Sequence, residues 1–416
     1  MASVAKHTDI PAFGNLQGVK VVVSAVSTAG PFAGELFAEQ GADVIWLESP
    51  KGIDPLRWTQ DGWGVQNERR NMRTLMLDVV SGEGRDVFLK LIEGVDIFIE
   101  ASRGGQWDKW GYSDELLWER NPKLVIGHMS GYGSTGDPAY VNLPGYDFTV
   151  NAFSGLMYLN GYKDGPPYMI QKFVTDYYAG LFAYGSALAA YVGALRTGKG
   201  DSFDLAQFEA AVRCQGGLFG KWFEKGIQEE RGAGAPRDNI SAGAGYYECK
   251  DGEGVYLFTA GQGPTKKALD FFGLEYGSEL FPEGIPSVGI DTPGAPVFDG
   301  AIEAYCAEHT AAEFADAMAK IGIPCSVVMN YEMMEEHPHY LARNTWVEWD
   351  TVDGKTVKGV TSVPRFKNNP STIWRGCPSQ GMDNDDILSE IGFDESEIAE
   401  LYEKKIIRKT DYVGGL

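Results

Sequence analysis

Short apolar runs alternate with helical patterns through the first third of the chain. Val19–Ser24 and Ala42–Leu47 are predicted strands, and the stretch from Pro31 to Gln40 between them has helical spacing. The same pattern continues with predicted strands at Leu75–Leu77, Asp96–Ile99 and Leu124–Ile126, and with helices at Glu83–Ile92 and Asp114–Arg120. Strands and helices joined by short links predict a parallel sheet with helices on both faces. The predicted fold class is therefore α/β.

The chain is too long for one hydrophobic core. It has 416 residues, whereas single cores stop growing at roughly 250–300 residues. The longest helical pattern runs from Asp176 to Leu195, and Gly198 is placed to end it. After Gly226 the composition changes, and residues 228–245 have the character of a linker. We therefore predict a large domain over 1–225, a linker and small α+β domain over 226–329, and a return to the large domain over 330–416. Phe203–Ala211 is predicted as a short strand followed by a helix, and two helices of the small domain are predicted near Thr265–Phe272 and Ala311–Ile321. Asp386–Leu401 is predicted as one final helix.

The charge and the cysteines limit the partners and the compartment. The formal net charge is −22 at pH 7, which disfavours binding to nucleic acid or to an anionic membrane. No stretch has the roughly 20 apolar residues that we expect of a membrane span, and the first residues lack a signal-peptide core. The five cysteines form no CxxC pair. We expect a cytoplasmic protein with reduced thiols.

Asp176 stands at the head of the longest predicted helix. The ordinary interpretation is a helix cap, whose carboxylate accepts backbone N–H bonds. The functional interpretation uses the same physics, because a carboxylate at a helix N-terminus is expected to stay ionised and so to act as a nucleophile. Composition alone leaves both interpretations open.

Two glycine-rich segments follow predicted strands. Residues 131–136 offer backbone N–H groups, and Tyr132 and Gly133 are candidates to contact a phosphate or an oxyanion. Residues 260–263 form either a simple turn or a mobile flap, with Gly261 and Gln262 at its centre. His128, beside the first segment, is predicted as a satisfied core histidine rather than a catalyst.

Basic residues gather where predicted parallel strands meet loops. Arg70 is flanked by further arginines and by Asn71, and Arg103 and Lys109 follow the strand Asp96–Ile99. In so acidic a chain this is where a phosphorylated ligand would bind, and a solvated basic face is the alternative. The strand–turn–helix at Val19–Gly34 lacks the GxGxxG of a dinucleotide site. No spacing favours a metal site, since the proline between His337 and His339 stiffens that pair.

The order of these motifs resembles the family III CoA transferases along nearly the whole chain. The segments that carry the resemblance are Gln17–Val22 with Ala29–Pro31, Asn71 with its arginines, Leu77-Asp78, Asp96–Glu100, Ser130–Gly136, Pro144–Asp147, Asp176 with Ala179-Gly180, and Thr197–Gly200. The resemblance implies a Rossmann-like large domain made from both chain ends, a small middle domain and an interlocked homodimer. It also implies an enzyme that needs no metal or redox cofactor and takes CoA esters as substrates.

The resemblance assigns roles to particular residues. Asp176 would attack an acyl-CoA, and an aspartyl-CoA thioester would form on it before the acceptor acid reacts. Arg103 falls at a basic CoA contact, and Lys109 could replace a second one because Trp110 occupies the expected position. Arg70, Asn71, Tyr132 and Gly133 are the other predicted CoA contacts, and Gly261 and Gln262 would form the flap.

The nearest subgroup resembles the carnitine and bile-acid CoA transferases. Pro364–Pro370 and Ile373–Gly376 are similar to the tail of the carnitine branch, whereas Gly104–Gln106 is similar to the bile-acid branch. We expect the acceptor to be a carnitine, γ-butyrobetaine or crotonobetaine type of acid, with a bile acid as the alternative. An acyl-CoA racemase is the other rival, but Tyr146 stands where racemases carry a histidine, and neutral tyrosine is a poor base at pH 7.

Overall fold

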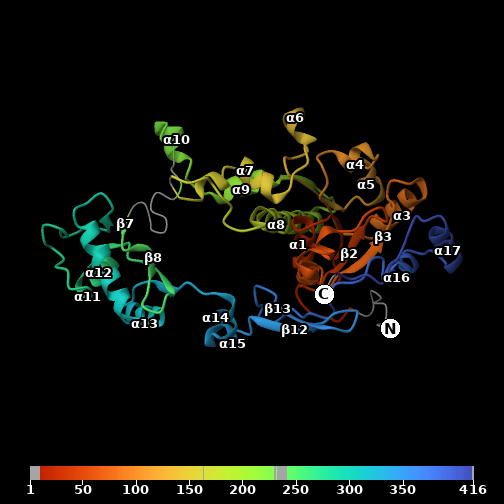
Figure 1. Ribbon diagram of the computed structural model, residues 1–416. Helices are drawn as coiled ribbons and strands as arrows, with labels where there is room; N and C mark the ends of the chain where they lie inside the picture. The colour runs from red at the N-terminus through yellow and green to blue at the C-terminus, as the bar shows by residue number, and fades with distance from the viewer. Residues whose placement is uncertain (1–9, 163, 229–230, 232–240, 415–416) are drawn as a thin grey trace. The chain divides into compact units, whose positions relative to one another are not determined.

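The chain forms two compact units in the computed structural model, which describes residues 10–162, 164–228, 231 and 241–414. Unit 1 comprises residues 1–156, 171–216 and 342–416, and unit 2 comprises 157–170 and 217–341 (Figure 1). The predicted boundaries were 225 and 329, and residues 157–170 were predicted in the large domain. Most of the predicted linker, 228–245, lies outside the described residues.

Unit 1 is built on a six-stranded, wholly parallel sheet. Its strands are β1 (Lys20–Ser24), β2 (Asp43–Glu48), β3 (Arg73–Met76), β4 (Ile97–Glu100), β5 (Val125–Ser130) and β6 (Ser202–Ala206). The order β3-β2-β1-β4-β5-β6 reverses direction between β1 and β4. This confirms the predicted α/β class. In such sheets ligands bind at the point of reversal, beyond the carboxyl ends of the strands.

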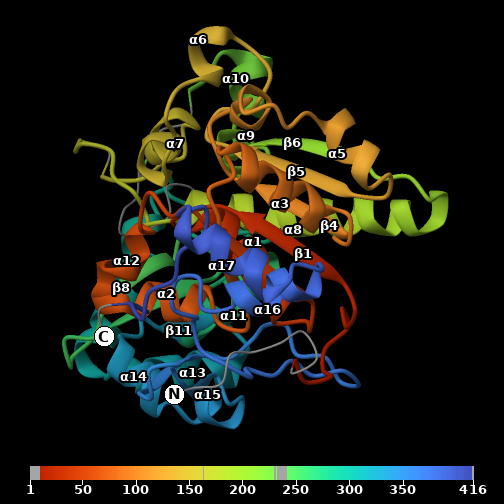
Figure 2. The ribbon, with the colours of Figure 1, turned by 90° about the vertical axis from the view of Figure 1, so that its right-hand side faces the viewer.

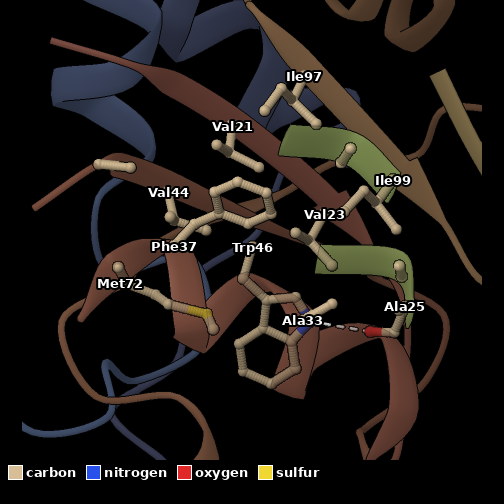
Figure 3. Packing of buried hydrophobic residues seen from close by; sticks show 14 of the residues in the cluster. Val21, Val23, Ala25, Ala33, Phe37, Val44, Trp46, Met72, Ile97 and Ile99 are labelled. Atoms are coloured by element: carbon tan, nitrogen blue, oxygen red, sulfur yellow. Dashed lines mark hydrogen bonds between the residues drawn. The ribbon is translucent and has the colours of Figure 1, made fainter. Parts of the chain in front are cut away.

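Helices cover both faces of this sheet, because its strands are apolar on both sides. All six residues of β2 are buried. On one face, Val21, Phe37 and Trp46 belong to a core that includes alanines of the long helix α8 (Figure 3). On the other face, Val22, Phe88 and Phe98 pack in a second core. Figure 2 shows α3 and α8 on opposite faces of the strands.

The helices of unit 1 are α1 (Ala29–Ala38), α2 (Trp63–Glu68), α3 (Gly82–Ile92), α4 (Gln106–Lys109), α5 (Asp114–Arg120), α6 (Pro138–Val141), α7 (Asp147–Phe153), α8 (Val174–Thr197), α9 (Gln207–Cys214), α16 (Asn384–Glu390) and α17 (Glu395–Glu403). Some of them were predicted, among them α1, α3, α5 and α8, whereas the short helices α2, α4, α6 and α7 were not. Helix α8 ends as expected, with Gly198 in the left-handed conformation at φ 73°. The predicted final helix is wrong in one respect. It is split into α16 and α17, because Gly392 is left-handed and Asp394 begins a new capping box.

Helix α8 differs from expectation in its hydropathy. By length and apolar composition it qualifies as a possible membrane span, which the sequence analysis had not expected of any stretch. In the structure it packs against α1 and β5, and Ala179, Ala183 and Ala187 are buried in the core. Its opposite side leaves Leu181 and Leu195 more than half exposed.

The C-terminal segment completes the edge of the sheet. Strand β3 is the outer strand, and its backbone N–H groups at Thr74 and Met76 donate to the side chains of Asp383 (2.8 Å) and Asn384 (2.9 Å). A two-stranded antiparallel ribbon, β12 (Trp346–Asp350) with β13 (Thr356–Val360), precedes this segment. Edge strands otherwise expose unpaired N–H groups, so these side chains protect β3.

Unit 2 has its own core around a three-stranded antiparallel sheet in the order β11-β9-β8. Its elements are α10 (Gly220–Lys225), β7 (Ser241–Ala242), β8 (Ala244–Glu248), β9 (Gly254–Phe258), α11 (Gln262–Phe271), β10 (Val288–Gly289), α12 (Ala295–Glu308), α13 (Ala311–Ile321), β11 (Cys325–Val327), α14 (Tyr331–Glu336) and α15 (Pro338–Ala342), the last of which ends where unit 1 resumes. Helices α11 and α13 were predicted from the sequence, whereas α12 was not.

Candidate active site

A cavity of about 250 Å³ opens at the carboxyl ends of β1, β4 and β5. It therefore lies at the point where the strand order reverses. Its lining comprises Val26–Gly30, Ala101–Arg103, Met129–Gly131, Leu143–Tyr146, Asp176 and Gln207. Among these described lining residues, Asp176 is the single carboxylate.

Asp176 lies in the first turn of α8, as its third residue. Only 6% of it is exposed, and its Oδ1 accepts a hydrogen bond from the Nε2 of Gln207. The helix-cap interpretation of Asp176 is wrong, because the residue lies inside the helix and Phe173 occupies the cap position without a side-chain hydrogen bond.

Asp147 supplies the cap that Asp176 does not. It is the first residue of α7, and its carboxylate accepts from the backbone N–H groups of Phe173 (3.0 Å) and Thr175 (2.8 Å). The same Oδ1 accepts the Thr175 hydroxyl at 2.6 Å. Helix α8 thus has a carboxylate at its positive end that comes from another helix, and Asp176 is left to face the cavity.

The surroundings of Asp176 oppose its ionisation. Burial, the charge of Asp147 and the more distant charge of Glu68 together raise the pKa of Asp176 to about 7, although the Gln207 hydrogen bond lowers it. The expectation that the helix terminus would keep this carboxylate ionised is therefore wrong. Desolvation and a like charge outweigh the helix dipole, whose effect is typically 0.3–1 kcal/mol.

Glu68, at the end of α2, forms a second buried acid behind this site. Its carboxylate accepts a hydrogen bond from the hydroxyl of Tyr177, the residue that follows Asp176. Burial raises the pKa of Glu68 to about 7, despite the opposing effects of Tyr177, Arg69 and Arg70. Sequence reasoning missed Glu68 and Gln207, because neither lies in a recognisable motif and only the fold brings them toward Asp176.

Comparison with known proteins decides the family. The model of CoA-transferase family III matches residues 16–384. The chain belongs to this family. The protein is therefore a CoA transferase, an enzyme that acts on CoA esters, and the predicted resemblance is confirmed.

Solved structures show the same fold for this transferase. A crystal structure of a CaiB/BaiF family protein from Brucella suis has a TM-score of 0.76 and 26% identity, and the match covers 91% of this chain and all 100% of that one. Rv3272 from Mycobacterium tuberculosis has a TM-score of 0.77 at 20% identity, over 90% of this chain and 99% of that one, which shows the fold alone. The CaiB/BaiF name fits the predicted carnitine and bile-acid branch.

The two basic residues predicted to contact CoA, Arg103 and Lys109, differ in whether they line the cavity. Arg103 is exposed and lines the cavity. Lys109, at the end of α4, is also exposed but does not line it, and its Nζ donates to the side chain of Asn142. Trp110 packs with its ring edge-on against Trp107, at 5.7 Å between ring centroids. Of these residues, only Arg103 borders the cavity.

Arg70 and Asn71 belong to the interior rather than to the cavity. The Arg70 guanidinium is 3% exposed and pairs with Glu35 and Glu39. The Asn71 side chain donates to the carbonyl of Thr372 at 2.7 Å and accepts from the Trp374 N–H at 2.8 Å. These residues fasten the C-terminal segment to the N-terminal part of the sheet. Their predicted contact with CoA is contradicted, because their polar groups are taken by protein partners.

Two backbone amides of the glycine-rich loop after β5 are bound by the carboxylate of Asp204. The N–H of Ser134 donates to both oxygens of Asp204, at 2.9 and 3.0 Å, and the Thr135 N–H donates at 3.2 Å. The amides of Ser134 and Thr135 therefore already have an acceptor, and the contact of Tyr132 and Gly133 with CoA stays a prediction. Tyr132 and Gly133 line a second cavity, of about 280 Å³, instead of the one with Asp176.

The predicted flap residues lie in unit 2. Gly261 has φ 108°, and its N–H donates to the Pro286 carbonyl at 2.7 Å. Gln262 begins α11, and its side chain donates to the hydroxyl of Tyr276 at 3.4 Å. The segment before α11 is therefore short and anchored at Gly261. Its role as a flap stays a prediction.

His128 and Tyr146 occupy different surroundings. The two ring nitrogens of His128 contact Glu100 (3.0 Å) and Asp114 (2.9 Å). Burial alone would lower the pKa of His128, but the two carboxylates raise it to about 10. This confirms the satisfied histidine. Tyr146 is 57% exposed and lines the cavity with Asp176.

Proposed function

We propose that Asp176 is the nucleophile of this CoA transferase and carries the acyl group and CoA in turn. The observation that supports the assignment is its position as the single carboxylate among the described residues that line the cavity. The ionised carboxylate attacks the thioester carbonyl of the acyl-CoA and expels CoA thiolate, which leaves a mixed anhydride. The thiolate then attacks the aspartyl carbonyl and expels the donor acid, which leaves an aspartyl-CoA thioester.

The acceptor acid reverses these two steps. Its carboxylate attacks the aspartyl thioester and releases CoA thiolate, and the thiolate attacks the acceptor's acyl carbon to give the new CoA ester and free Asp176. A pKa of about 7 suits this exchange, because about half of the carboxylates are ionised at neutral pH while burial keeps them poorly solvated.

Chemical trapping tests the nucleophile. Hydroxylamine added during turnover is expected to convert the carboxyl group of Asp176 to a hydroxamate, which peptide mass spectrometry locates. The matched control is enzyme with hydroxylamine and no acyl-CoA, which should remain unmodified. A hydroxamate at another residue, or none during rapid turnover, contradicts the proposal.

The acceptor in this proposal is a small trimethylammonium acid such as carnitine, γ-butyrobetaine or crotonobetaine. A quaternary ammonium group has no N–H to donate and is recognised by aromatic faces and negative charge. Adjacent residues line the two cavities: Gly131 and Gln207 line the cavity with Asp176, whereas their neighbours Tyr132 and Ala206 line the second cavity. That cavity has aromatic residues, among them Tyr140 and Phe153, together with Asp137 and Glu209.

Competition between acids tests the acceptor. With one acyl-CoA donor, γ-butyrobetaine and cholate are supplied together, and mass spectrometry follows both CoA products. We expect the betaine product to dominate. Transfer to cholate with none to any betaine would support the bile-acid alternative and leave the transferase assignment standing.

The racemase alternative requires a base on each side of the substrate's α-carbon. Tyr146 lines the cavity, and none of the described lining residues is a histidine. The transferase therefore has the better support. Retention of the α-proton during turnover in deuterated water is the result expected of a transferase.

The proposed assembly is an interlocked homodimer. The exposed side of α8 supports it, because Leu181, Val192 and Leu195 are each more than half exposed along one helix. Exposed apolar stripes of this kind mark protein interfaces. Since threaded chains separate only on unfolding, dilution to nanomolar concentration should yield no folded monomer in light scattering. A folded, active monomer would rule the proposal out.

A further inference from the structure

Gln207 makes the closest polar contact to the proposed nucleophile. It is the first residue of α9, directly after β6, and it is 5% exposed. Its Nε2 donates to Oδ1 of Asp176 and lies 3.3 Å from the hydroxyl oxygen of Thr175. The residue also lines the cavity. A buried neutral donor therefore contacts Oδ1 of Asp176 and leaves Oδ2 out of this hydrogen bond.

We propose that Gln207 is the oxyanion donor for the steps in which the acylated Asp176 is attacked. This inference rests on the proposed function, because it assumes that Asp176 forms the anhydride and the thioester. It adds a residue that acts on the reacting group itself.

The chemistry follows from the oxygen that Gln207 contacts. When Oδ2 of Asp176 bonds to an acyl group, Oδ1 becomes a carbonyl oxygen. Attack by CoA thiolate on this carbonyl carbon forms a C–S bond, and the electron pair of the C=O bond moves to Oδ1. The Gln207 N–H stabilises this oxyanion through its hydrogen bond and keeps its proton. The intermediate collapses when the carbonyl re-forms and the donor carboxylate leaves with Oδ2–Cγ bond cleavage.

The same donor serves the thioester. An acceptor carboxylate attacks the aspartyl carbonyl carbon, and negative charge again develops on the oxygen that faces Gln207. Collapse then expels CoA thiolate. Because the amide is already in place, little reorganisation is needed when the charge appears, which is the condition for effective electrostatic stabilisation.

The position of Gln207 is fixed from a second side. The Thr175 hydroxyl that it contacts is itself bonded to Asp147 at 2.6 Å, and Thr175 is fully buried. The groups that face Asp176 are thus the amide of Gln207 from α9, the carboxylate of Asp147 from α7 and, farther away, that of Glu68 from α2. Gln207 is the one of these that favours negative charge on Asp176.

Replacement of Gln207 by methionine tests the inference. Gln207→Met keeps the length of the side chain and removes the donor, so kcat should fall about 100- to 1000-fold, the typical effect of losing one oxyanion donor. The KM for acyl-CoA should change little. The acid limb of kcat/KM should also move to higher pH, because the ionised form of Asp176 loses its hydrogen bond. The control is Gln215→Met at the other end of α9, whose side chain donates to the Ser154 carbonyl and does not line the cavity.

Trapping with hydroxylamine separates the possible failures. Labelling of Asp176 in the unmodified enzyme and in Gln207→Met, together with the loss in kcat, supports the donor role. Labelling of Asp176 with an unchanged kcat and acid limb in Gln207→Met overturns that role alone. Absence of labelling in the unmodified enzyme overturns the proposed nucleophile instead. If Gln207→Met does not fold, Gln207→Glu keeps the shape of the side chain and is expected to show the same loss at pH 8.

Discussion

Two carboxylates of unit 1, Asp176 and Asp114, differ in the side chain that donates a hydrogen bond to them, which is the neutral amide of Gln207 for Asp176 and the imidazole of His128 for Asp114. Burial and the charges of Asp147 and Glu68 raise the pKa of Asp176 to about 7. Around His128, two carboxylates contact one imidazole, which remains protonated because its pKa rises to about 10. Burial would raise the pKa of Asp114 there, but the hydrogen bonds from His128 and Ser202 lower it. A carboxylate is thus ion-paired at His128, whereas Asp176 is a buried acid with a raised pKa.

The hydrogen-bond donor of a carboxylate affects both its contribution to stability and its nucleophilicity. A carboxylate paired with a cation stabilises the folded state but is a poor nucleophile, because its charge is neutralised. A carboxylate among other carboxylates has the opposite properties. Acids with strongly perturbed pKa values are typical of functional sites, and Asp176 lines the cavity.

The largest expected effect is on activity after Asp176→Asn. The change keeps the shape of the side chain and removes the covalent pathway, so turnover should fall by several orders of magnitude while the fold is retained. Asp114→Asn is the matched control and should lose stability rather than activity. A near-normal rate for Asp176→Asn would contradict the assignment of Asp176 as the nucleophile.

Arg103 provides the next test, because it brings a cation to the rim of the Asp176 cavity. Arg103→Ala should raise the KM for CoA esters about 10- to 100-fold, since a charge-assisted hydrogen bond to phosphate contributes about 1.5–3 kcal/mol. The KM for the free acid should change much less. Lys109→Ala is the control, because Lys109 does not line the cavity. An equal effect of the two variants on KM would count against CoA binding at Arg103.

His128→Gln removes the cation that contacts Asp114. The free energy of unfolding should fall by about 1.5–3 kcal/mol, the usual contribution of hydrogen bonds to charged groups. Because the folded pKa is raised from 6.5 to about 10, the stabilisation is complete below pH 6.5 and is lost as the pH rises toward 10. Urea unfolding between pH 6 and pH 10 should therefore give a falling stability that is flatter in the variant. A parallel pair of curves would show that the imidazole does not carry the charge.

The smallest expected effect is that of Asp147→Asn on the pKa of Asp176. Asp147→Asn removes the like charge, so the pKa of Asp176 should fall and the acid limb of kcat/KM should move to lower pH. The helix cap is kept in part, because the asparagine oxygen still accepts the backbone N–H groups. The pH–rate profiles of the two enzymes measure the change. An acid limb that stays in place would show that burial alone raises the pKa of Asp176.

The sequence predicted the sheet well, because each strand is marked by a local pattern. Apolar runs bounded by turns gave the six strands within a few residues, and Asp114–Arg120 was predicted with its observed bounds. Helix α12 was missed, since Gly294, Pro296 and Gly300 weaken a helical pattern that tertiary packing restores. The division of the last helix was missed, although Gly392 and the capping box of Asp394 are the kind of signal that correctly placed the end of α8 at Gly198.

The site residues that could be predicted from the sequence are those that lie in a recognisable motif. Asp176 and Arg103 were found and line the cavity. Arg70 and Asn71 were misplaced, because a basic cluster looks the same in sequence whether its partners are phosphates or the buried carboxylates of Glu35 and Glu39. Gln207 lies 31 residues from Asp176 along the chain, and only the pairing of β5 with β6 brings it to the cavity.

The side chains that protect β3 lie far from this strand along the chain. Asp383 and Asn384 supply the acceptors for an edge strand that begins at Arg73. A ribosome therefore completes almost the whole chain before that edge is protected, whereas residues 217–341 of unit 2 emerge earlier as a continuous segment. Domains generally fold as units during synthesis, and the ribosome adds roughly 5–20 residues per second. The edge of β3 therefore stays unprotected until Asp383 has been synthesised, 309 residues after Thr74.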